Sequence, residues 1–156
     1  MHELYASQLK LNLTNMFPFT VTCTSKIEAI NGSIDKSKGL AYLNNYIEKY
    51  KGEDIYISEN QIFFKPKFRI FASGWYKFSN IEQGEFILTD NSISFKFYMY
   101  RLLIIASIMA AFMGYSSKEV FVGIFCFLVL GVGNWVIALV KFRKMTNELA
   151  VTLSKL

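Results

Sequence analysis

The pattern of apolar and polar residues changes abruptly within the stretch NSISFKFYMYRLLIIASIMA, residues 91–110. In its first part, Ile93, Phe95 and Phe97 alternate with polar residues, and this period of two is typical of a half-buried β-strand. From Leu102 the chain is almost continuously apolar. The pattern therefore predicts a strand that passes at about Phe97 into an apolar helix, with no linker between the two.

The apolar region contains two runs that differ in length. The second run, residues 120–140, has 21 residues without a charge, which correspond to about 31 Å of helix and match the thickness of a hydrocarbon core. The first run, residues 102–115, is shorter and reaches the same length only as residues 97–117. Arg101 then lies about one turn inside the helix, where its long side chain can extend to the lipid headgroups. The sequence therefore predicts a transmembrane hairpin at residues 97–140.

Positive charges are distributed unequally around this hairpin. Only residues 116–119 connect the two runs, which suits a tight helical turn and leaves both flanks on one side of the membrane. Five cations lie on the flanks and one, Lys118, lies in the loop. The positive-inside rule therefore places both termini on the cytoplasmic side of a bacterial-type membrane. The flanking cations are Lys96, Arg101, Lys141, Arg143 and Lys144. Aromatic residues expected near the interfaces are Tyr98, Tyr100, Tyr115 and Phe142.

The residues before the hairpin have the pattern of a small α+β domain. Residues 17–23 alternate like a strand, and residues 37–52 carry an apolar helical stripe. Two β-hairpins are predicted with turns at residues 59–60 and 90–91, where Glu, Asp and Asn residues tolerate positive φ. Residues 75–78 predict one more short strand. Together these patterns predict a small antiparallel sheet with one principal helix, followed by the two-helix hairpin.

The predicted chain thus has three parts: a cytosolic α+β domain at residues 1–96, the hairpin at 97–140 with spans 97–117 and 120–140, and a basic juxtamembrane helical tail at 141–156. This order of elements, with the segment FRIFASGWYKFSNIEQGEFIL and the tail TNELAVTLSKL, resembles a group of small bacterial membrane proteins with a cytosolic β-rich domain. Some of those domains resemble pleckstrin-homology folds. The resemblance implies the topology and no particular activity.

Composition and charge agree with a chain in two environments. Hydrophobic residues make up 53% of the chain and the mean hydropathy is +0.27, which is high for a soluble protein. Residues 1–96 carry eleven cations and ten acids, so this part is almost neutral and lacks the cationic patch that nucleic-acid binding requires. Cys23 and Cys126 lie in different environments and are expected as small buried residues without a disulfide. The N-terminal residues lack the pattern of a cleavable signal peptide.

The residue types that carry catalysis are few. The single histidine, His2, lies at the terminus, and the sequence has no zinc-ligand spacing, phosphate-binding loop or nucleophile motif. Glu82 and Glu85 form a carboxylate pair in a predicted turn, where both are expected to be solvated. We therefore expect no catalytic residues, no metal and no cofactor, and a protein that is not an enzyme. An enzyme whose site this pattern does not display stays the open alternative.

Basic residues offer a second kind of site. Strand alternation places Lys65, Lys67 and Arg69 on one face of a segment, opposite Phe64 and Pro66. Such a face can bind phosphate, and with the cations near the membrane it can hold anionic lipid headgroups. The candidates are Lys65, Lys67, Arg69, Lys96, Arg101, Lys141, Arg143 and Lys144. The favoured alternative is a solvated strand whose lysines protect a sheet edge from pairing.

Small residues in the two spans predict how the hairpin closes. Ala106, Ala110 and Gly114 recur every fourth residue and form one groove on the first span, which allows close helix contact. The comparable face of the second span consists of Gly131, Asn134 and Ala138. Arg101 lies half a turn away from Ala110, so this packing turns it outward. An alternative arrangement pairs Arg101 with Asn134, which lies at equal depth.

These patterns favour a non-catalytic accessory or assembly subunit, whose cytosolic domain is tethered by a transmembrane hairpin. The expected partners are membrane lipids and either another membrane protein or a second copy of the chain, and not nucleic acid. The alternative is a module that senses anionic lipids.

Overall fold

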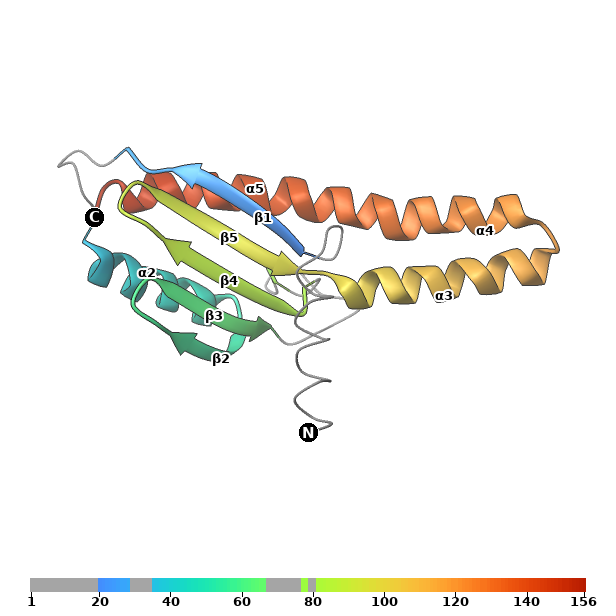
Figure 1. Ribbon diagram of the computed structural model, residues 1–156, viewed down its shortest axis with the longest axis horizontal. Coiled ribbons are helices and arrows are strands. Elements are labelled where there is room, and N and C mark those ends of the chain that lie inside the picture. The colour runs from blue at the N-terminus through green and yellow to red at the C-terminus, as the bar shows by residue number, and fades with distance from the viewer. Residues whose placement is uncertain (1–19, 29–34, 67–76, 79–80) are drawn as a thin grey trace, which may run out of the picture.

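The computed structural model describes residues 20–28, 35–66, 77–78 and 81–156. The molecule is elongated: an antiparallel sheet lies at one end, and a helical hairpin extends from it (Figure 1). The elements are β1 (Thr20–Lys26), α2 (Lys36–Lys49), β2 (Gly52–Ile57), β3 (Gln61–Pro66), β4 (Gln83–Leu88), β5 (Ser92–Tyr98), α3 (Tyr100–Ser117), α4 (Val120–Phe127), the π-helical η1 (Leu128–Gly133) and α5 (Asn134–Leu153). The predicted α+β class with a terminal pair of long apolar helices is confirmed.

The five strands follow the order β1-β5-β4-β3-β2, and every pair is antiparallel. Both predicted β-hairpins are present, with Ser58 N donating to Gln61 O at 2.8 Å and Thr89 N donating to Ser92 O at 2.9 Å. The turn residues, which tolerate positive φ, do not adopt it, because the described non-glycine residues with positive φ are Lys51, Asp54 and Lys118. Both two-residue turns, at residues 59–60 and 90–91, therefore form without a residue in the left-handed conformation.

Helix α2 begins and ends at sequence signals. The Asp35 carboxylate accepts hydrogen bonds from the backbone N–H groups of Ser37 and Lys38. In any helix the N–H groups of the first turn have no acceptor within the helix, so this cap satisfies two of them. Leu43 and Ile47 are fully buried on the predicted apolar stripe, which packs on the sheet. The helix stops where Lys51 takes a φ of 62°.

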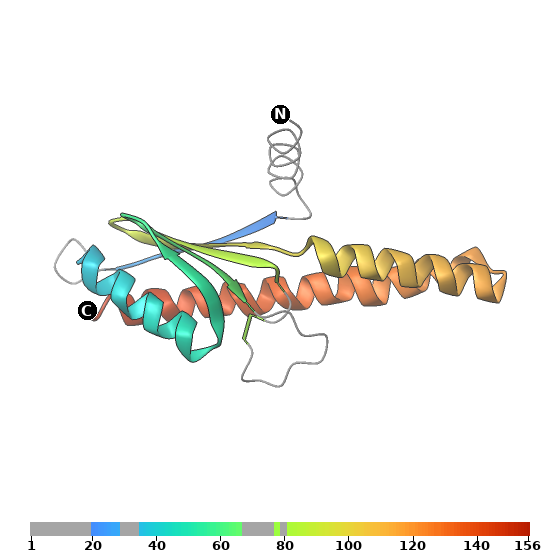
Figure 2. The ribbon, with the colours of Figure 1, turned by 90° about the horizontal axis from the view of Figure 1, so that it is seen from below.

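The core lies between the sheet and two helices that cover the same face, α2 and the second half of α5 (Figure 2). Phenylalanine rings meet there, with 4.5 Å between the ring centres of Phe86 on β4 and Phe95 on β5, and 5.6 Å between those of Phe95 and Phe97, both on β5. Gly84 makes room for this cluster, because a Cβ atom at that position would lie 2.5 Å from the Phe64 ring. Aromatic packing therefore holds the strands to one another and to the helices.

The C-terminal residues belong to this core, which the expectation of a separate basic tail missed. Phe142 is fully buried, 4.7 Å from the Phe97 ring centre and 5.2 Å from that of Phe95. Met145, Leu149 and Leu153 continue the buried stripe along α5. Phe142 and Tyr98, which is 8% exposed, therefore pack in the core and do not present their rings to a membrane surface. The tail serves as a core helix of the sheet domain.

The short strand expected at residues 75–78 is absent from the described part of that segment. Residues 75–76 lie outside the described residues, while Lys77 and Phe78 form a turn. Phe78 is fully buried between Phe64 and Tyr46, at 4.7 Å and 6.4 Å between ring centres. Phe78 therefore anchors the described part of this segment in the core.

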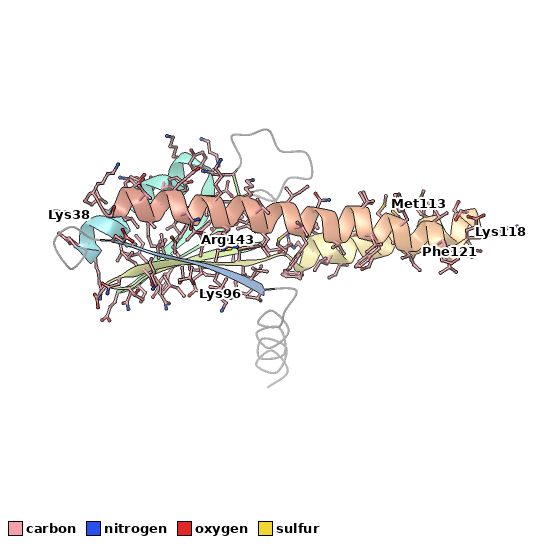
Figure 3. The ribbon with its side chains drawn as sticks, turned by 90° about the horizontal axis from the view of Figure 1, so that it is seen from above. Lys38, Lys96, Met113, Lys118, Phe121 and Arg143 are labelled. Atoms are coloured by element: carbon pink, nitrogen blue, oxygen red, sulfur yellow. The ribbon has the colours of Figure 1, made fainter. Side chains whose placement is uncertain are left out.

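In the part of the chain that the structure describes, two helices are long and apolar enough to span a membrane: α3, and the helix that runs from Val120 to Leu153 through α4, η1 and α5. Large apolar side chains cover the outside of the hairpin, and Figure 3 shows Met113 and Phe121 projecting from it near the loop. Phe121 is 84% exposed. Exposed apolar surface of this extent is what a lipid environment would cover.

Candidate functional site

The junction between sheet and hairpin is the place where the two parts of the molecule are fixed to each other. Strand β5 continues to Tyr98, and α3 begins at Tyr100, three residues after the predicted start at Phe97. Met99 alone separates the strand from the helix and is fully buried. The chain therefore passes from sheet to helix without a hinge, as the sequence pattern predicts, but the sheet extends further than expected.

Glu82 determines where this change occurs. Its backbone N–H donates to the Tyr98 carbonyl oxygen at 2.9 Å, and its carboxylate Oε1 accepts a hydrogen bond from the Arg101 backbone N–H at 2.8 Å. The residue before α3, Met99, provides no side-chain cap. Glu82 supplies that missing acceptor from a different segment, and a carboxylate is favoured at the positive end of the helix dipole. One residue thus holds both the end of β5 and the start of α3.

The carboxyl group of Glu82 is also in an unusual environment. The residue is 7% exposed, and within the described residues its Oε2 atom is buried without a hydrogen-bond partner. Burial raises the pKa of Glu82 to about 7, and the hydrogen bond from the Arg101 backbone and the charge of that residue oppose the rise without cancelling it. The expectation that Glu82 and Glu85 are both solvated is wrong. Glu85 lies half-buried on β4, 4.0 Å from the Lys96 ammonium group.

The sequence contains the information that would have identified Glu82. A β-hairpin with its turn at residues 90–91 pairs Gln83 with Tyr98, as the structure has it. The residue before Gln83 must then lie beside the residue that follows Tyr98, where the apolar helix begins. An acidic residue at that register is a candidate for capping the helix. The sequence pattern assigned Glu82 to a turn, so this role was missed.

The two spans pack through small residues. Ala106 and Ala110 are buried, and a Cβ atom at Gly131 would lie 3.4 Å from the Cβ of Ala106. A Cβ atom at Gly123 would lie 2.8 Å from the Ala110 carbonyl oxygen and 3.3 Å from the Gly114 Cα. The first-span groove thus contacts Gly123 and Gly131, so that the backbones approach closely near the loop. Gly123 was absent from the predicted face because it lies two turns from Gly131.

The polar residues of the hairpin have separate partners. The Asn134 side-chain amide donates to the Leu130 carbonyl oxygen at 2.8 Å, within its own helix and beside the π-helical turn. Arg101 is exposed, and its backbone N–H contacts Glu82. The Asn134 side-chain amide thus donates within its own helix, which differs from the alternative that pairs it with Arg101. Ala138 is 1% exposed and joins the core cluster at the sheet end.

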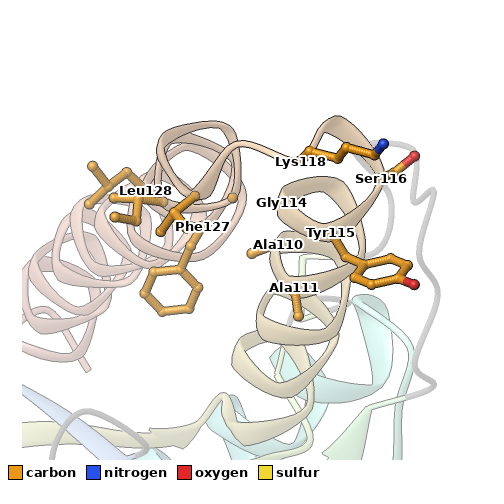
Figure 4. Close-up of a pocket in the computed structure, with 11 residues that line it drawn as sticks. Ala110, Ala111, Gly114, Tyr115, Ser116, Lys118, Phe127 and Leu128 are labelled. Carbon is orange, nitrogen blue, oxygen red and sulfur yellow. The ribbon is translucent and has the colours of Figure 1, made fainter.

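A groove of about 850 Å³ lies between α3 and α4 near the connecting loop. Figure 4 shows Phe127 and Leu128 on one side of it, with Ala110, Ala111 and Gly114 on the other. Most of the lining is apolar, and Tyr115, Ser116 and Lys118 line the end of the groove near the loop. The groove suits an apolar chain such as a lipid tail.

The predicted headgroup residues that the structure describes do not form one patch. Lys65 is exposed on β3, while Lys67 and Arg69 lie outside the described residues. Since β3 lies between β2 and β4, Lys65 does not protect a sheet edge, so this alternative is wrong for the described part of the segment. Lys96 lies on the face of the sheet that points away from the helices, near Glu85 and 5.4 Å from the Tyr98 ring centre.

The basic residues of α5 lie along its sheet-proximal half. Lys141 is half-buried, 5.6 Å from the Phe142 ring centre, and Arg143 and Lys144 are exposed. Arg143 faces β1, because its charge reaches the Cys23 thiol, whose pKa is raised by burial and lowered by that charge to a smaller extent. Of the predicted set, Lys141 is the residue that meets a further cation, Lys77, which sequence reasoning did not include.

No protein-family model, curated protein or solved structure matches this chain significantly, so the resemblance to small bacterial membrane proteins stands on the order of elements alone.

Proposed function

We propose that this protein is a non-catalytic assembly subunit of a membrane complex, anchored by its helical hairpin, with both termini on the cytoplasmic side of a bacterial-type cytoplasmic membrane. The observation that supports this most directly is the 34-residue helix Val120–Leu153. Its first part lines the hairpin and its last part fills the core of the sheet domain. A protein built in this way holds a folded domain at a fixed height and orientation beside the membrane.

The second connection supports the same function. Met99 is the one residue between β5 and α3, and Glu82 holds both ends of that step. Two rigid connections remove the freedom that a flexible tether gives. Such rigidity benefits a subunit that must present one surface to a neighbour, because a preorganised surface loses less entropy on binding.

The open face of the sheet and the outside of the hairpin are the surfaces available to a partner. Both helices that cover the sheet within the described residues lie on one face, so the strands expose a polar second face (Figure 2). The hairpin exposes apolar residues along its length. A neighbouring membrane protein or a second copy of the chain can contact both surfaces at once.

Co-purification tests the proposal. The tagged full-length chain is extracted from its own membrane in a mild detergent, and the mass and composition of the particle are measured at low and high salt. We expect a stoichiometric second component, either another membrane protein or a second copy, that stays bound at high salt because apolar contacts hold it. A monomer that captures no more protein than an unrelated tagged helical hairpin would contradict the proposal.

A module that binds anionic lipids is the second candidate function. It is favoured by the basic residues Lys141, Arg143 and Lys144, which follow the apolar part of the long helix directly. Each cation near an anionic surface contributes on the order of 1 kcal/mol, and salt weakens the attraction. Binding to anionic vesicles that disappears at high salt, without a protein partner, would favour this function over assembly.

A further inference from the structure

A cluster of aromatic and cationic side chains lies between the end of α2 and the middle of α5. The Lys77 ammonium group donates a hydrogen bond to the Tyr46 hydroxyl oxygen at 2.5 Å. It also lies 5.1 Å from the Tyr46 ring centre and 4.8 Å from that of Tyr50. The two rings meet edge to face, 4.8 Å apart. Lys77 is therefore held in a defined position by contacts with α2.

A second ammonium group, that of Lys141 on α5, lies near this one, because the residues that follow the two lysines, Phe78 and Phe142, stack with 6.4 Å between their ring centres. Lys141 is half-buried, and its pKa is lowered first by burial and then by the positive charge of Lys77. Within the described residues, neither lysine forms an ion pair with a carboxylate. The sequence around Lys77 offers none either, because residues 65–81 contain four cations and no acid. Two like charges held together without a counter-ion are unfavourable, and an anion between them would remove that cost.

The Tyr46 hydroxyl adds a directed donor. Its oxygen accepts a hydrogen bond from the Lys77 ammonium group, so its own hydrogen stays available for an acceptor. Burial, as the largest cause, raises the pKa of Tyr46, which keeps the hydroxyl protonated. Two ammonium groups and one hydroxyl donor, carried by different elements, match the several acceptor oxygens of a phosphate group.

The position of the cluster along the molecule indicates where the phosphate comes from. Lys141 is the first charged residue after the 21 uncharged residues 120–140. In the proposed membrane orientation it lies at the level of the lipid headgroups. We infer that Lys77, Lys141 and the hydroxyl group of Tyr46 form a binding site for the phosphate group of an anionic phospholipid. This site deepens the second candidate function and does not depend on the assembly role.

Among the described residues, one carboxylate, that of Glu148, is close enough for its charge to act on Tyr46. Glu148 is exposed on α5, two turns beyond Lys141, and its charge contributes to the raised pKa of Tyr46. It opposes an anion at the site. Replacing Glu148 with glutamine should therefore strengthen phosphate binding, whereas a site for a cation would be weakened by the same change.

The test measures lipid binding by the full-length protein in a neutral detergent. Thermal unfolding is followed while phosphatidylglycerol or phosphatidylcholine is added, and an apparent affinity is obtained from the increase in Tm. We expect phosphatidylglycerol to stabilise the protein, and Lys77→Gln and Lys141→Gln each to weaken this binding about tenfold, in line with the loss of one headgroup contact. The matched control is Lys65→Gln, which removes the same charge from an exposed strand position and should leave the affinity unchanged.

Two further variants separate binding from folding. Lys77→Arg keeps the charge and should keep binding within about twofold of the original, while Tyr46→Phe keeps the ring and should weaken binding. The double change of Lys77 and Lys141 should cost less than the two single effects combined, since both contact one phosphate. Equal losses from Lys65→Gln and Lys77→Gln would overturn the inference, because a diffuse charge effect would then explain the binding.

Inorganic phosphate distinguishes the source of the ligand. If phosphate, compared with chloride at the same ionic strength, stabilises the protein alone and competes with phosphatidylglycerol, the site binds phosphate from solution as well as from lipid. If it does neither while the lysine variants still lose lipid binding, the ligand is the lipid headgroup. If phosphatidylcholine binds as tightly as phosphatidylglycerol and no variant changes either affinity, the site does not exist.

Discussion

Replacing Glu82 with glutamine should change how the stability of the protein depends on pH. In the folded protein, burial raises the pKa of Glu82 to about 7 from an ordinary value of 4.5. The folded state thus holds this proton more tightly than the unfolded chain. Its contribution to stability is fully present below pH 4.5 and is lost as the pH rises through 7. Glutamine has no proton to lose, so the variant lacks this decline.

The magnitude follows from the two pKa values. A difference between 4.5 and about 7 corresponds to ~3 kcal/mol, since each pKa unit is worth about 1.4 kcal/mol. For a chain of this size, ~1 kcal/mol shifts Tm by about 2–4 °C, so the shift here is ~6–12 °C. The glutamine carbonyl can still accept the Arg101 N–H, so the cap on α3 is retained. Glu82→Ala removes that acceptor and should cost ~1 kcal/mol relative to the glutamine variant at every pH.

The assay follows unfolding of the full-length protein in a neutral detergent from pH 4 to 8.5. The quantity that matters is the difference in Tm between Glu82→Gln and the original chain, because other titrating groups cancel in it. We expect this difference to increase in favour of the variant between pH 4.5 and 7.5 and then to level off. The matched control is Glu59→Gln, at an exposed turn position, which should follow the original chain. A difference that stays constant with pH, or that favours the original chain at high pH, would refute the reasoning.

Three other predictions concern the hairpin and its connection to the sheet. Gly123→Ala should separate the spans and cost ~1–3 kcal/mol in a detergent unfolding assay, since its Cβ would lie 2.8 Å from a backbone oxygen, whereas Gly133→Ala, with its nearest contact at 3.6 Å, should be mild. Phe142→Ala should destabilise the sheet domain by ~3–5 kcal/mol, measured by denaturant unfolding. In a chain without its native cysteines, Ser117→Cys should react with an impermeant thiol reagent only from outside the cell, and Ser58→Cys only from inside.

Each of these has a result that would contradict it. Equal stability of the two glycine variants would mean that the helices are not in close contact at Gly123. A small effect at Phe142 would mean that the end of α5 is not part of the core. Labelling of Ser58→Cys from outside would reverse the proposed orientation of the chain in the membrane.

Local patterns were sufficient for much of the fold. The alternation around Phe95, the two short turns and the apolar stripe of α2 predict elements that the structure contains, because each depends on neighbours a few residues away. The role of the C-terminal residues was missed although Phe142, Met145, Leu149 and Leu153 recur at helical spacing. Their basic neighbours led to the interpretation of a membrane-surface tail, while the partner of that stripe is a sheet formed much earlier in the chain.

The candidate sites depend on contacts between distant segments, which explains why they were harder to predict. Glu82 caps a helix that begins eighteen residues later, and Lys77 reaches α2 on one side and Lys141 on the other. Neither residue has a distinctive local pattern. Pairing register would have revealed Glu82, since the β4–β5 hairpin fixes it opposite Met99. Lys77 follows a segment with no regular periodicity, so only the fold brings it to its partners.

The two sites lie where the chain enters the hairpin and where it leaves it. A helix that leaves a soluble sheet for an apolar environment has backbone N–H groups without partners at its start, and water cannot reach them once the junction is buried. Glu82 satisfies one of these groups from within the domain. Where the long helix returns, Lys141 is the first charge and is half-buried, and the positive charge of Lys77 acts on it. The entry of the chain into the hairpin is thus completed by a residue of the protein, whereas its exit leaves a charge for an external anion to neutralise.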